Sequence, residues 1–441
     1  MRTVSHKVLK TGARARVFRH KSIAERNERG YLRYGRKKNV AVETAADEYS
    51  KTAVPSAARK SFLSVLVISL GYVFVVTSMQ AGSSIGVGLS FNHMVWAVLV
   101  SSAILTVLSC IMGVIAAKSG LSFGKVGTWV PVLIVAVTTI GWFSIDAYLI
   151  GDSAHRLFSW MPTIVVCILA GIGMTITASK GTKWMNTLAN IAVPIILIFG
   201  FISIIKAFRD IGGVAGINAI VKEDTLTFAK AVSLGVGSYA VGSVMFTPDI
   251  MRFAKNAKSS IVAMIITIMV GNSFMVFFGA IGSVVYNDPD IMGVLALQGL
   301  LAPAFIVMVL NIWSTAQGCV YSGSMSLSSV IKVPRNKLTL VFGLLGTILG
   351  CIGFYNLFGS YINFLSATVP PIVGIVLADY LTKYSKGYTD LESLPQADIG
   401  GFVAWILGFA STYINFFLPS VNCVIVAFVV KVIFNKVGKK Q

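Results

Sequence analysis

Residues 235–243 read Gly235-Val236-Gly237-Ser238-Tyr239-Ala240-Val241-Gly242-Ser243, inside an apolar stretch that otherwise looks like one membrane-spanning helix. Glycine frees the backbone from helical geometry. Hydrocarbon accommodates irregular backbone only where protein or a water-filled cavity surrounds it. The stretch therefore predicts a helix broken at a binding site. A similar weak point is predicted at residues 78–84 of the first apolar segment, and matched breaks in two halves are typical of repeat-built transporters.

The composition places the chain among polytopic membrane proteins. Of its 441 residues, 55% are hydrophobic and 12% are charged, and the mean hydropathy is +0.79. Such a composition is typical of a chain that crosses a bilayer many times. It leaves no room for a water-soluble catalytic domain.

The formal charge of +20 is concentrated near the N-terminus. Residues 1–60 hold 16 Lys and Arg against five acidic residues. We interpret residues 1–47 as a disordered, basic cytoplasmic tail that is attracted to anionic lipid headgroups, and not as a nucleic-acid-binding arm. Residues 1–40 contain neither a long apolar run nor a small-residue cleavage site, so no signal peptide is predicted.

Hydropathy windows of about 20 residues predict twelve membrane spans. With the basic tail inside, the inner loops contain twelve Lys and Arg and the outer loops five, as expected if both termini are cytoplasmic in the cell membrane. The predicted spans are 61–79, 95–117, 127–152, 160–178, 185–207, 228–250, 259–284, 299–327, 338–353, 356–380, 400–418 and 420–436.

Cysteines and histidines are not arranged for catalysis or metal binding. The five cysteines are odd in number, lack paired spacing and fall in predicted spans, so we interpret them as small apolar residues. The four histidines lie in the tail or in loops. A membrane enzyme would need a buried nucleophile with its base or a metal cluster, and a channel would need a continuous polar pore. Neither pattern is present, and no cofactor is predicted.

The third predicted span carries three candidate site residues, Thr139, Trp142 and Asp146, on one helical stripe. Asp146 is the only acidic residue well inside a span. An unpaired carboxylate in hydrocarbon costs at least about 2.5–3.5 kcal/mol, so such groups face a cavity or a partner. The functional interpretation is a contact to substrate or to a coupling proton; the alternative is access to outer water or an internal hydrogen bond. Beside this acid, Trp142 offers a flat face for a flat solute.

The sixth span offers a second ring at Tyr239 and a hydroxyl at Ser238. Two aromatic faces with a few hydrogen-bonding groups suit a planar heterocycle, because stacking attracts both faces and polar groups select the edge. The alternative is that Tyr239 is structural.

The eighth span carries oxygen-bearing side chains at Asn311, Ser314 and Thr315. Together with carbonyls freed by an unwound first span they form a candidate Na⁺ site, since hard cations prefer oxygen. The alternative is that these side chains join helices by hydrogen bonds.

The chain resembles the nucleobase:cation symporter family, closest to its cytosine permease branch. The resemblance covers about residues 48–435 and rests on motifs that occur in order at matching spacing: Glu48-Tyr49-Ser50, Val54-Pro55, Gly141-Trp142-Phe143, Val236-Gly237-Ser238-Tyr239, residues 252–258, Leu310-Asn311-Ile312-Trp313, residues 364–371 and Ala378-Asp379-Tyr380.

This resemblance implies an all-α, LeuT-like fold with a five-plus-five inverted repeat. Repeat one would span about 61–207 and repeat two about 228–380, with spans one and six broken, two further helices at about 400–436 and a tail at 437–441, the transporter domain covering 48–436. It also implies residue roles. The predicted substrate site contains Trp142, Tyr239 and Ser238, whose roles the resemblance implies, together with Thr139, Asp146, Gly237, Ala316 and Gln317. The resemblance places the cation site at Asn311, Ser314, Thr315 and the carbonyls of Gly71 and Val75.

The chain departs from the cytosine branch at three of these positions. Thr139 replaces a glutamine, Ala316 an asparagine and Asp146 a glycine. We predict a secondary transporter that imports a nucleobase or related planar N-heterocycle with Na⁺ or H⁺ by alternating access. The alternative ligands are a hydantoin, allantoin or a pyrimidine-type vitamin precursor. The predicted partners are this small solute and the lipid bilayer, without nucleic acid or an obligate protein partner.

Overall fold

A computed structural model describes residues 53–119, 129–180, 182–220, 223–328, 330–331, 333–384, 398–414 and 416–437. The chain divides into two units, Met1–Tyr49 and Ser50–Gln441, and every described residue belongs to the second unit. The predicted tail at 1–47 and nearly all of the predicted tail at 437–441 lie outside the described residues.

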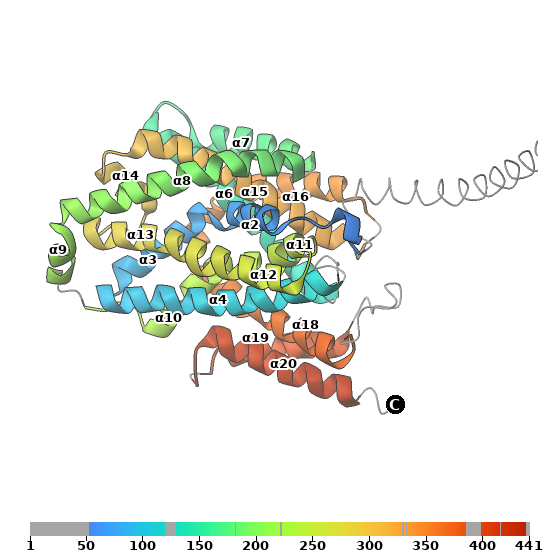
Figure 1. Ribbon diagram of the computed structural model, residues 1–441. Helices are drawn as coiled ribbons and strands as arrows, with labels where there is room; N and C mark the ends of the chain where they lie inside the picture. Colours follow the sequence, from blue (N-terminus) through green and yellow to red (C-terminus); the bar gives the residue numbers. More distant parts are fainter. Residues whose placement is uncertain are drawn as a thin grey trace, which may run out of the picture. The chain divides into compact units, whose positions relative to one another are not determined.

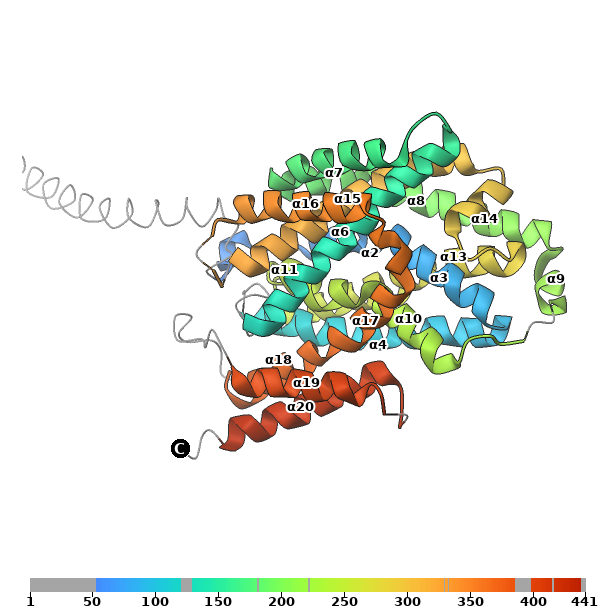
Figure 2. The same ribbon diagram turned by 180° about the vertical axis from the view of Figure 1, so that it is seen from behind.

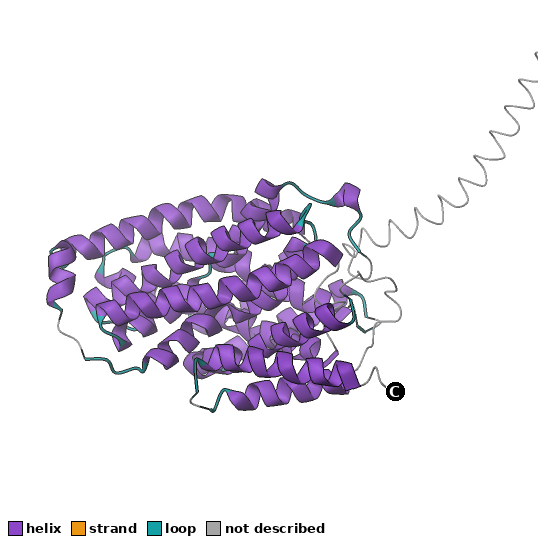
Figure 3. Ribbon diagram, turned by 60° about the horizontal axis from the view of Figure 1, so that its bottom comes forward, coloured by secondary structure: helices purple, strands orange, loops and turns teal. Residues whose placement is uncertain are grey.

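The described part of the second unit is all-helical (Figures 1 and 3). Its first half contains a short 3₁₀ turn at Ser56–Ala58 and the helices α2 (Phe62–Val73), α3 (Val76–Gly88), α4 (Phe91–Ser119), α6 (Trp129–Leu157), α7 (Thr163–Ser179), α8 (Thr182–Asp210) and α9 (Gly213–Ala219).

The second half begins with α10 (Phe228–Val241), the π-helical turn η2 (Gly242–Phe246) and α11 (Thr247–Met251). It continues with α12 (Ala257–Met264), the π-helical η3 (Ile265–Asn272), α13 (Ser273–Tyr286), α14 (Ile291–Leu297), α15 (Leu301–Ser328), α16 (Arg335–Cys351), the 3₁₀ turn η4 (Phe354–Leu357), α17 (Phe358–Thr368), α18 (Pro370–Thr382), α19 (Ile399–Ser411) and α20 (Pro419–Val437). Figure 2 shows α6, α15 and α17 from the side where all three are visible.

The first span is broken, but not where the sequence predicted. α2 and α3 meet at an angle of 54°, and the break lies at Phe74 and Val75. Residues 78–84 are helical inside α3. Their glycine serves close packing: a Cβ on Gly82 would lie 2.0 Å from the carbonyl oxygen of Val276 in α13. The predicted weak point at 78–84 is therefore wrong by one turn.

The predicted break in the sixth span is also wrong. α10 runs without interruption through the glycine-rich stretch to Val241, and η2 and α11 continue it. The glycines allow neighbouring groups to approach: a Cβ on Gly237 would lie 2.3 Å from the Ile362 carbonyl oxygen of α17, and one on Gly242 would meet the ring of Tyr239. The irregularity at this depth is a π turn, a feature often found at functional sites.

Helix packing shows the two-fold repeat predicted for the fold. α3 packs on α13 as α10 packs on α4; α6 packs on α16 as α15 packs on α7; and α2 packs on α8 as α10 packs on α17. In these comparisons α2 and α3 of the first half correspond to α10 of the second half. In the same way α4 corresponds to α13, α6 to α15, α7 to α16 and α8 to α17. Such reciprocal packing is what an inverted repeat of five segments produces.

Each of the twelve predicted spans contains at least one helix of the described chain. Among the described residues, eight continuous helical stretches qualify as membrane-spanning by length and composition alone, or nine when α2 and α3 are counted as one bent span, and α7 and α19 are shorter apolar helices. The chain is therefore a multi-pass membrane protein, and the total of twelve crossings stays a prediction.

A buried charge cluster joins α18, α19 and α20. Lys431 of α20 is fully buried, and its ammonium contacts the carboxylates of Asp398 and Asp379, the latter at 3.3 Å. Asp379 also pairs with Lys383 (3.2 Å) and accepts a hydrogen bond from Asn435 (2.8 Å). Sequence reasoning missed this cluster, because Lys431 stands alone in an apolar stretch.

We expect Lys431→Met to destabilise the protein by about 3–5 kcal/mol, because removing one partner of a buried ion pair leaves uncompensated charge. Thermal unfolding of the purified protein in detergent measures this loss. Lys436→Met, at an exposed position of the same helix, is the matched control and should have little effect. Lys431→Met combined with Asp398→Asn should recover part of the loss, and no recovery would contradict the electrostatic explanation.

Candidate substrate and cation sites

Trp142 lies in the middle of α6 with 6% of its surface exposed. Its indole meets Tyr361 and Phe358 of α17 edge-on, with ring centroids 5.5 and 6.4 Å apart. Tyr361 is held by a hydrogen bond from its hydroxyl to the Thr138 carbonyl oxygen of α6. A Cβ on Gly141 would lie 2.7 Å from the Tyr361 hydroxyl oxygen, so this glycine makes room for Tyr361 against α6.

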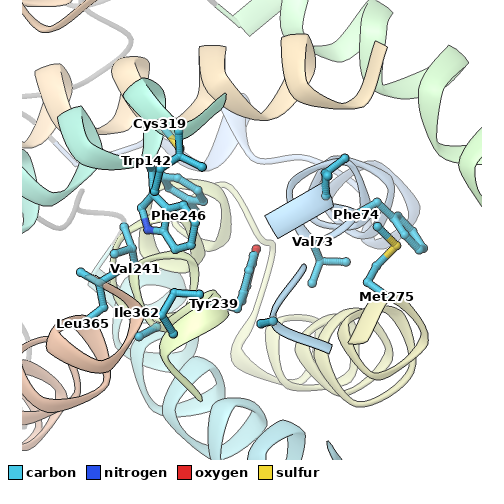
Figure 4. Close-up of a cluster of buried hydrophobic side chains, with 14 of the residues drawn as sticks. Val73, Phe74, Trp142, Tyr239, Val241, Phe246, Met275, Cys319, Ile362 and Leu365 are labelled. Atoms are coloured by element: carbon cyan, nitrogen blue, oxygen red, sulfur yellow. The ribbon is translucent and has the colours of Figure 1, made fainter. Parts of the chain in front are cut away.

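Tyr239 of α10 belongs to the same buried cluster as Trp142. Figure 4 shows Trp142, Tyr239 and Phe246 in this cluster together with Val73 and Phe74, which adjoin the break between α2 and α3. Tyr239 is 5% exposed. Ser238 beside it is buried, and its hydroxyl donates to the Gly235 carbonyl oxygen of its own helix (2.8 Å).

Asp146 lies one helical turn beyond Trp142 and is 4% exposed. Within the described part of the chain, its carboxylate has neither a hydrogen-bond donor nor a basic side chain as partner. Cys319 of α15 and Tyr361 of α17 are within electrostatic range of it, and Cys319 is also within range of Tyr239. Asp146 of α6 therefore lies near residues of α15 and α17, and Cys319 is a neighbour that it shares with Tyr239 of α10.

The remaining predicted substrate residues are placed less favourably. Thr139 is fully buried at the contact between α6 and α15, where it packs against Gly323, and its hydroxyl donates to the Ala136 carbonyl oxygen (2.7 Å). The amide of Gln317 donates to the Thr177 hydroxyl of α7 (2.7 Å). Gly237 lies at the contact between α10 and α17, and Ala316 is buried in α15. The structure thus places Trp142 and Asp146 one turn apart on α6, with Trp142 and Tyr239 in one buried cluster, and uses Thr139 and Gln317 between scaffold helices.

Asn311 of α15 holds the break in the first span. Its side-chain oxygen accepts from the backbone amide of Val76 (2.9 Å), and its side-chain nitrogen donates to the carbonyl oxygen of Phe74. These are backbone groups that the break leaves without helical partners. The Val75 amide donates to Val73 (2.9 Å), so the Gly71 carbonyl lacks its usual partner four residues later.

Two hydroxyls of α15 lie within about one turn of Asn311, whose side chain holds this break. The hydroxyls of Ser314 and Thr315 donate to the backbone carbonyl oxygen of Asn311, at 2.8 and 3.1 Å. Both residues are at most 7% exposed. With the carbonyls of Gly71 and Val75 nearby in the first span, the donor set consists of neutral oxygens, which suits a hard monovalent cation.

Two contacts join segments that are distant along the chain, and sequence reasoning missed them. Tyr72 of α2, next to the break in the first span, packs edge-on against Phe246 of η2, with ring centroids 5.1 Å apart. Arg156 of α6 pairs with Asp290, which caps α14 (2.7 Å). Burial raises the pKa of Asp290, and the Arg156 guanidinium opposes that shift. The side chain of Gln80 in α3 bonds to the backbone on either side of Asp290.

Comparison with known proteins agrees with this architecture. Residues 53–435 match the family described as permeases for cytosine/purines, uracil, thiamine and allantoin. The cytosine permease of Escherichia coli strain K12 is 33% identical over 343 residues, which cover 76% of this chain and 81% of that protein.

Solved structures share the fold at low sequence identity. Mhp1, described as a nucleobase-cation-symport-1 family transporter in a closed conformation with bromovinylhydantoin bound, has a TM-score of 0.78 and 16% identity, covering 89% of this chain and 96% of that chain. The inward-facing conformation of Mhp1 has a TM-score of 0.77 and 15% identity, over 89% and 94% of the two chains. MhsT in complex with L-phenylalanine has a TM-score of 0.56 and 12% identity, over 84% and 98%. These matches confirm the LeuT-like fold.

Proposed function

Because the chain belongs to the family of permeases for cytosine/purines, uracil, thiamine and allantoin, we propose that it imports a planar N-heterocycle through the cytoplasmic membrane together with a cation. The chain is a nucleobase-type membrane transporter, since its relatives are permeases and symporters and not enzymes. The proposal adds the direction of transport, the residues of the site and the coupling. It also adds the orientation, with both termini in the cytoplasm, which the Lys and Arg bias of the inner loops supports.

One observation carries the assignment of the site: Trp142 and Tyr239 are both buried in one cluster beside the broken first span. The two side chains come from different repeats, and their rings do not contact each other within the described structure. A planar ring held between them would gain stacking on both faces. An aromatic pair that served only to fill the core would have no need of an unpaired acid beside it.

Uptake into proteoliposomes tests this proposal. Labelled cytosine, adenine, uracil, hydantoin, allantoin and a pyrimidine-type vitamin precursor should be compared at equal concentration. At least one of these planar solutes should accumulate and be displaced by its own unlabelled form. Accumulation of none of them, with the protein shown to be folded by its cooperative thermal unfolding, contradicts the proposal.

Sodium is the proposed coupling ion. The support is the neutral oxygen set formed by Asn311, Ser314 and Thr315 with the carbonyls of Gly71 and Val75. Ser314→Ala combined with Thr315→Ala should raise the Na⁺ concentration for half-maximal uptake by about tenfold or more, because two oxygen ligands are lost. Ser328→Ala is the matched control, since its hydroxyl is also buried and bonded to its own helix. Uptake that persists without Na⁺ and collapses with the pH gradient would assign the coupling to protons.

A further inference from the structure

The acid next to Trp142 has no counterion among the described residues. Asp146 is almost completely buried, and none of the basic side chains that the structure describes pairs with its carboxylate. The nearby hydroxyl of Tyr361 is already donated to the Thr138 backbone. Charged groups on α6 further along the helix, Asp152 and Arg156, pair with each other at 2.7 Å. The buried carboxyl group of Asp146 is therefore available to something that enters the site.

Aromatic side chains lie close to Asp146. Trp142 is one turn away on α6, and Tyr361 of α17 is within electrostatic range of the acid. Trp142 also meets Tyr361 and Phe358 edge-on, and Tyr239 and Phe246 belong to the same buried cluster as Trp142. Aromatic faces attract cations through their quadrupoles, most strongly where water is excluded. Rings around a single buried carboxylate are the arrangement that recognises an organic cation, whereas a neutral base would need amide or hydroxyl partners along its edge.

Few amide groups remain to hydrogen-bond a neutral base. Position 316 is alanine, and the side-chain nitrogen of Gln317 donates to Thr177 of α7, which leaves its side-chain oxygen as a buried acceptor without a partner. Thr139 uses its hydroxyl within its own helix. Next to Trp142 on α6, the Asp146 carboxyl is the one acidic acceptor among the described residues of that stripe. Hydrogen bonds to a charged group are roughly twice as strong as those between neutral groups.

Resting on the proposed function, we infer that the solute carries a positive charge: a cationic planar N-heterocycle, such as an aminopyrimidinium or another ring with a charged nitrogen, that pairs with Asp146 while its ring stacks on Trp142. Binding then brings together one negative and one positive charge where water is excluded. This accounts for the placement of an acid where the chain supplies no base. A carboxylate buried without such a partner would have to hold a proton.

Binding of two matched probes tests this inference. 1-Methylcytosine and 4-amino-1-methylpyrimidinium share the ring, the amino group and the methyl group; the second lacks the 2-oxo group and carries a permanent charge. At fixed Na⁺, the wild-type protein should bind the cation at least about tenfold more tightly, a difference of about 1.4 kcal/mol. Asp146→Asn, which keeps the shape and removes the charge, should abolish this preference.

Controls separate this inference from the proposed function. Asp152→Asn, six residues along the same helix, should leave the ratio of the two affinities unchanged. Trp142→Ala should weaken both probes alike. Tighter wild-type binding of the neutral probe, or an Asp146→Asn variant with an unchanged ratio, overturns the cationic assignment even if planar solutes are transported. A third result also overturns the cationic assignment: the transported solute is neutral, and its uptake depends on pH in the wild type but not in Asp146→Asn. In that case Asp146 carries a coupling proton. If no planar solute binds and Trp142→Ala changes nothing, the proposed function fails as well.

Discussion

Trp142→Ala is expected to weaken binding of the transported solute by roughly tenfold to a hundredfold, corresponding to the loss of about 1–3 kcal/mol that truncating a stacked aromatic partner of a base causes. The indole is buried in the middle of α6, and α17 covers it with Tyr361 and Phe358. Truncation removes the stacking face and leaves the rest of the site in place. Equilibrium binding of the labelled solute to the purified protein measures the effect.

Two further variants show whether this loss is local. Trp142→Phe keeps an aromatic face and should retain binding to within a few-fold. Trp160→Ala removes an indole that is 75% exposed and should bind like the wild type. Equal affinity of Trp142→Ala and wild type, with both folded, would show that the solute stacks elsewhere.

Asn311→Ala is expected to destabilise the protein by about 2–6 kcal/mol. The side chain satisfies the Val76 amide and the Phe74 carbonyl at the break. Leaving a buried donor or acceptor unsatisfied costs about 1–3 kcal/mol for each group. Because the break also supplies carbonyls to the candidate cation site, the variant should lose Na⁺-dependent uptake as well. Thermal unfolding in detergent and uptake into proteoliposomes measure the two effects.

Asn422→Ala serves as the comparison. Its side-chain amide, in α20, makes a long hydrogen bond of 3.4 Å to the carbonyl oxygen of Ile414, which lies between α19 and α20. It should unfold close to the wild-type temperature and keep its Na⁺ dependence. If Asn311→Ala were as stable as Asn422→Ala, the side chain of Asn311 would not be what holds the broken span together.

Much of the fold could be predicted from the sequence because hydrophobic length is a local property. All twelve apolar windows contain helices of the described chain, and the transporter fold with repeats is confirmed. The first span is broken as predicted, but the predicted positions of both breaks were wrong for a common reason. A glycine in a membrane helix either frees the backbone or lets a neighbour approach, and Gly82 and Gly237 do the second. The partner that decides between these roles lies in another helix, far away along the chain.

The candidate site was predictable to the extent that it lies on one helix. Trp142 and Asp146 share a stripe of α6, and the spacing alone showed this. Tyr361 and Cys319 come from α17 and α15, and no local pattern connects them to α6. Asn311 was predicted as a cation ligand through its side chain. In the structure this side chain bridges the break, and its backbone carbonyl meets the Ser314 and Thr315 hydroxyls.

The central claim is that a flat solute is held by the indole of Trp142 and the phenol of Tyr239. It is tested most directly by a structure determined with the solute that the uptake comparison identifies. The ring of that solute should lie against Trp142, with Tyr239 on its opposite side and a charged or donor nitrogen within hydrogen-bond distance of Asp146. A solute bound outside the cluster that contains these residues, with Trp142 still packed only against protein, would contradict the account.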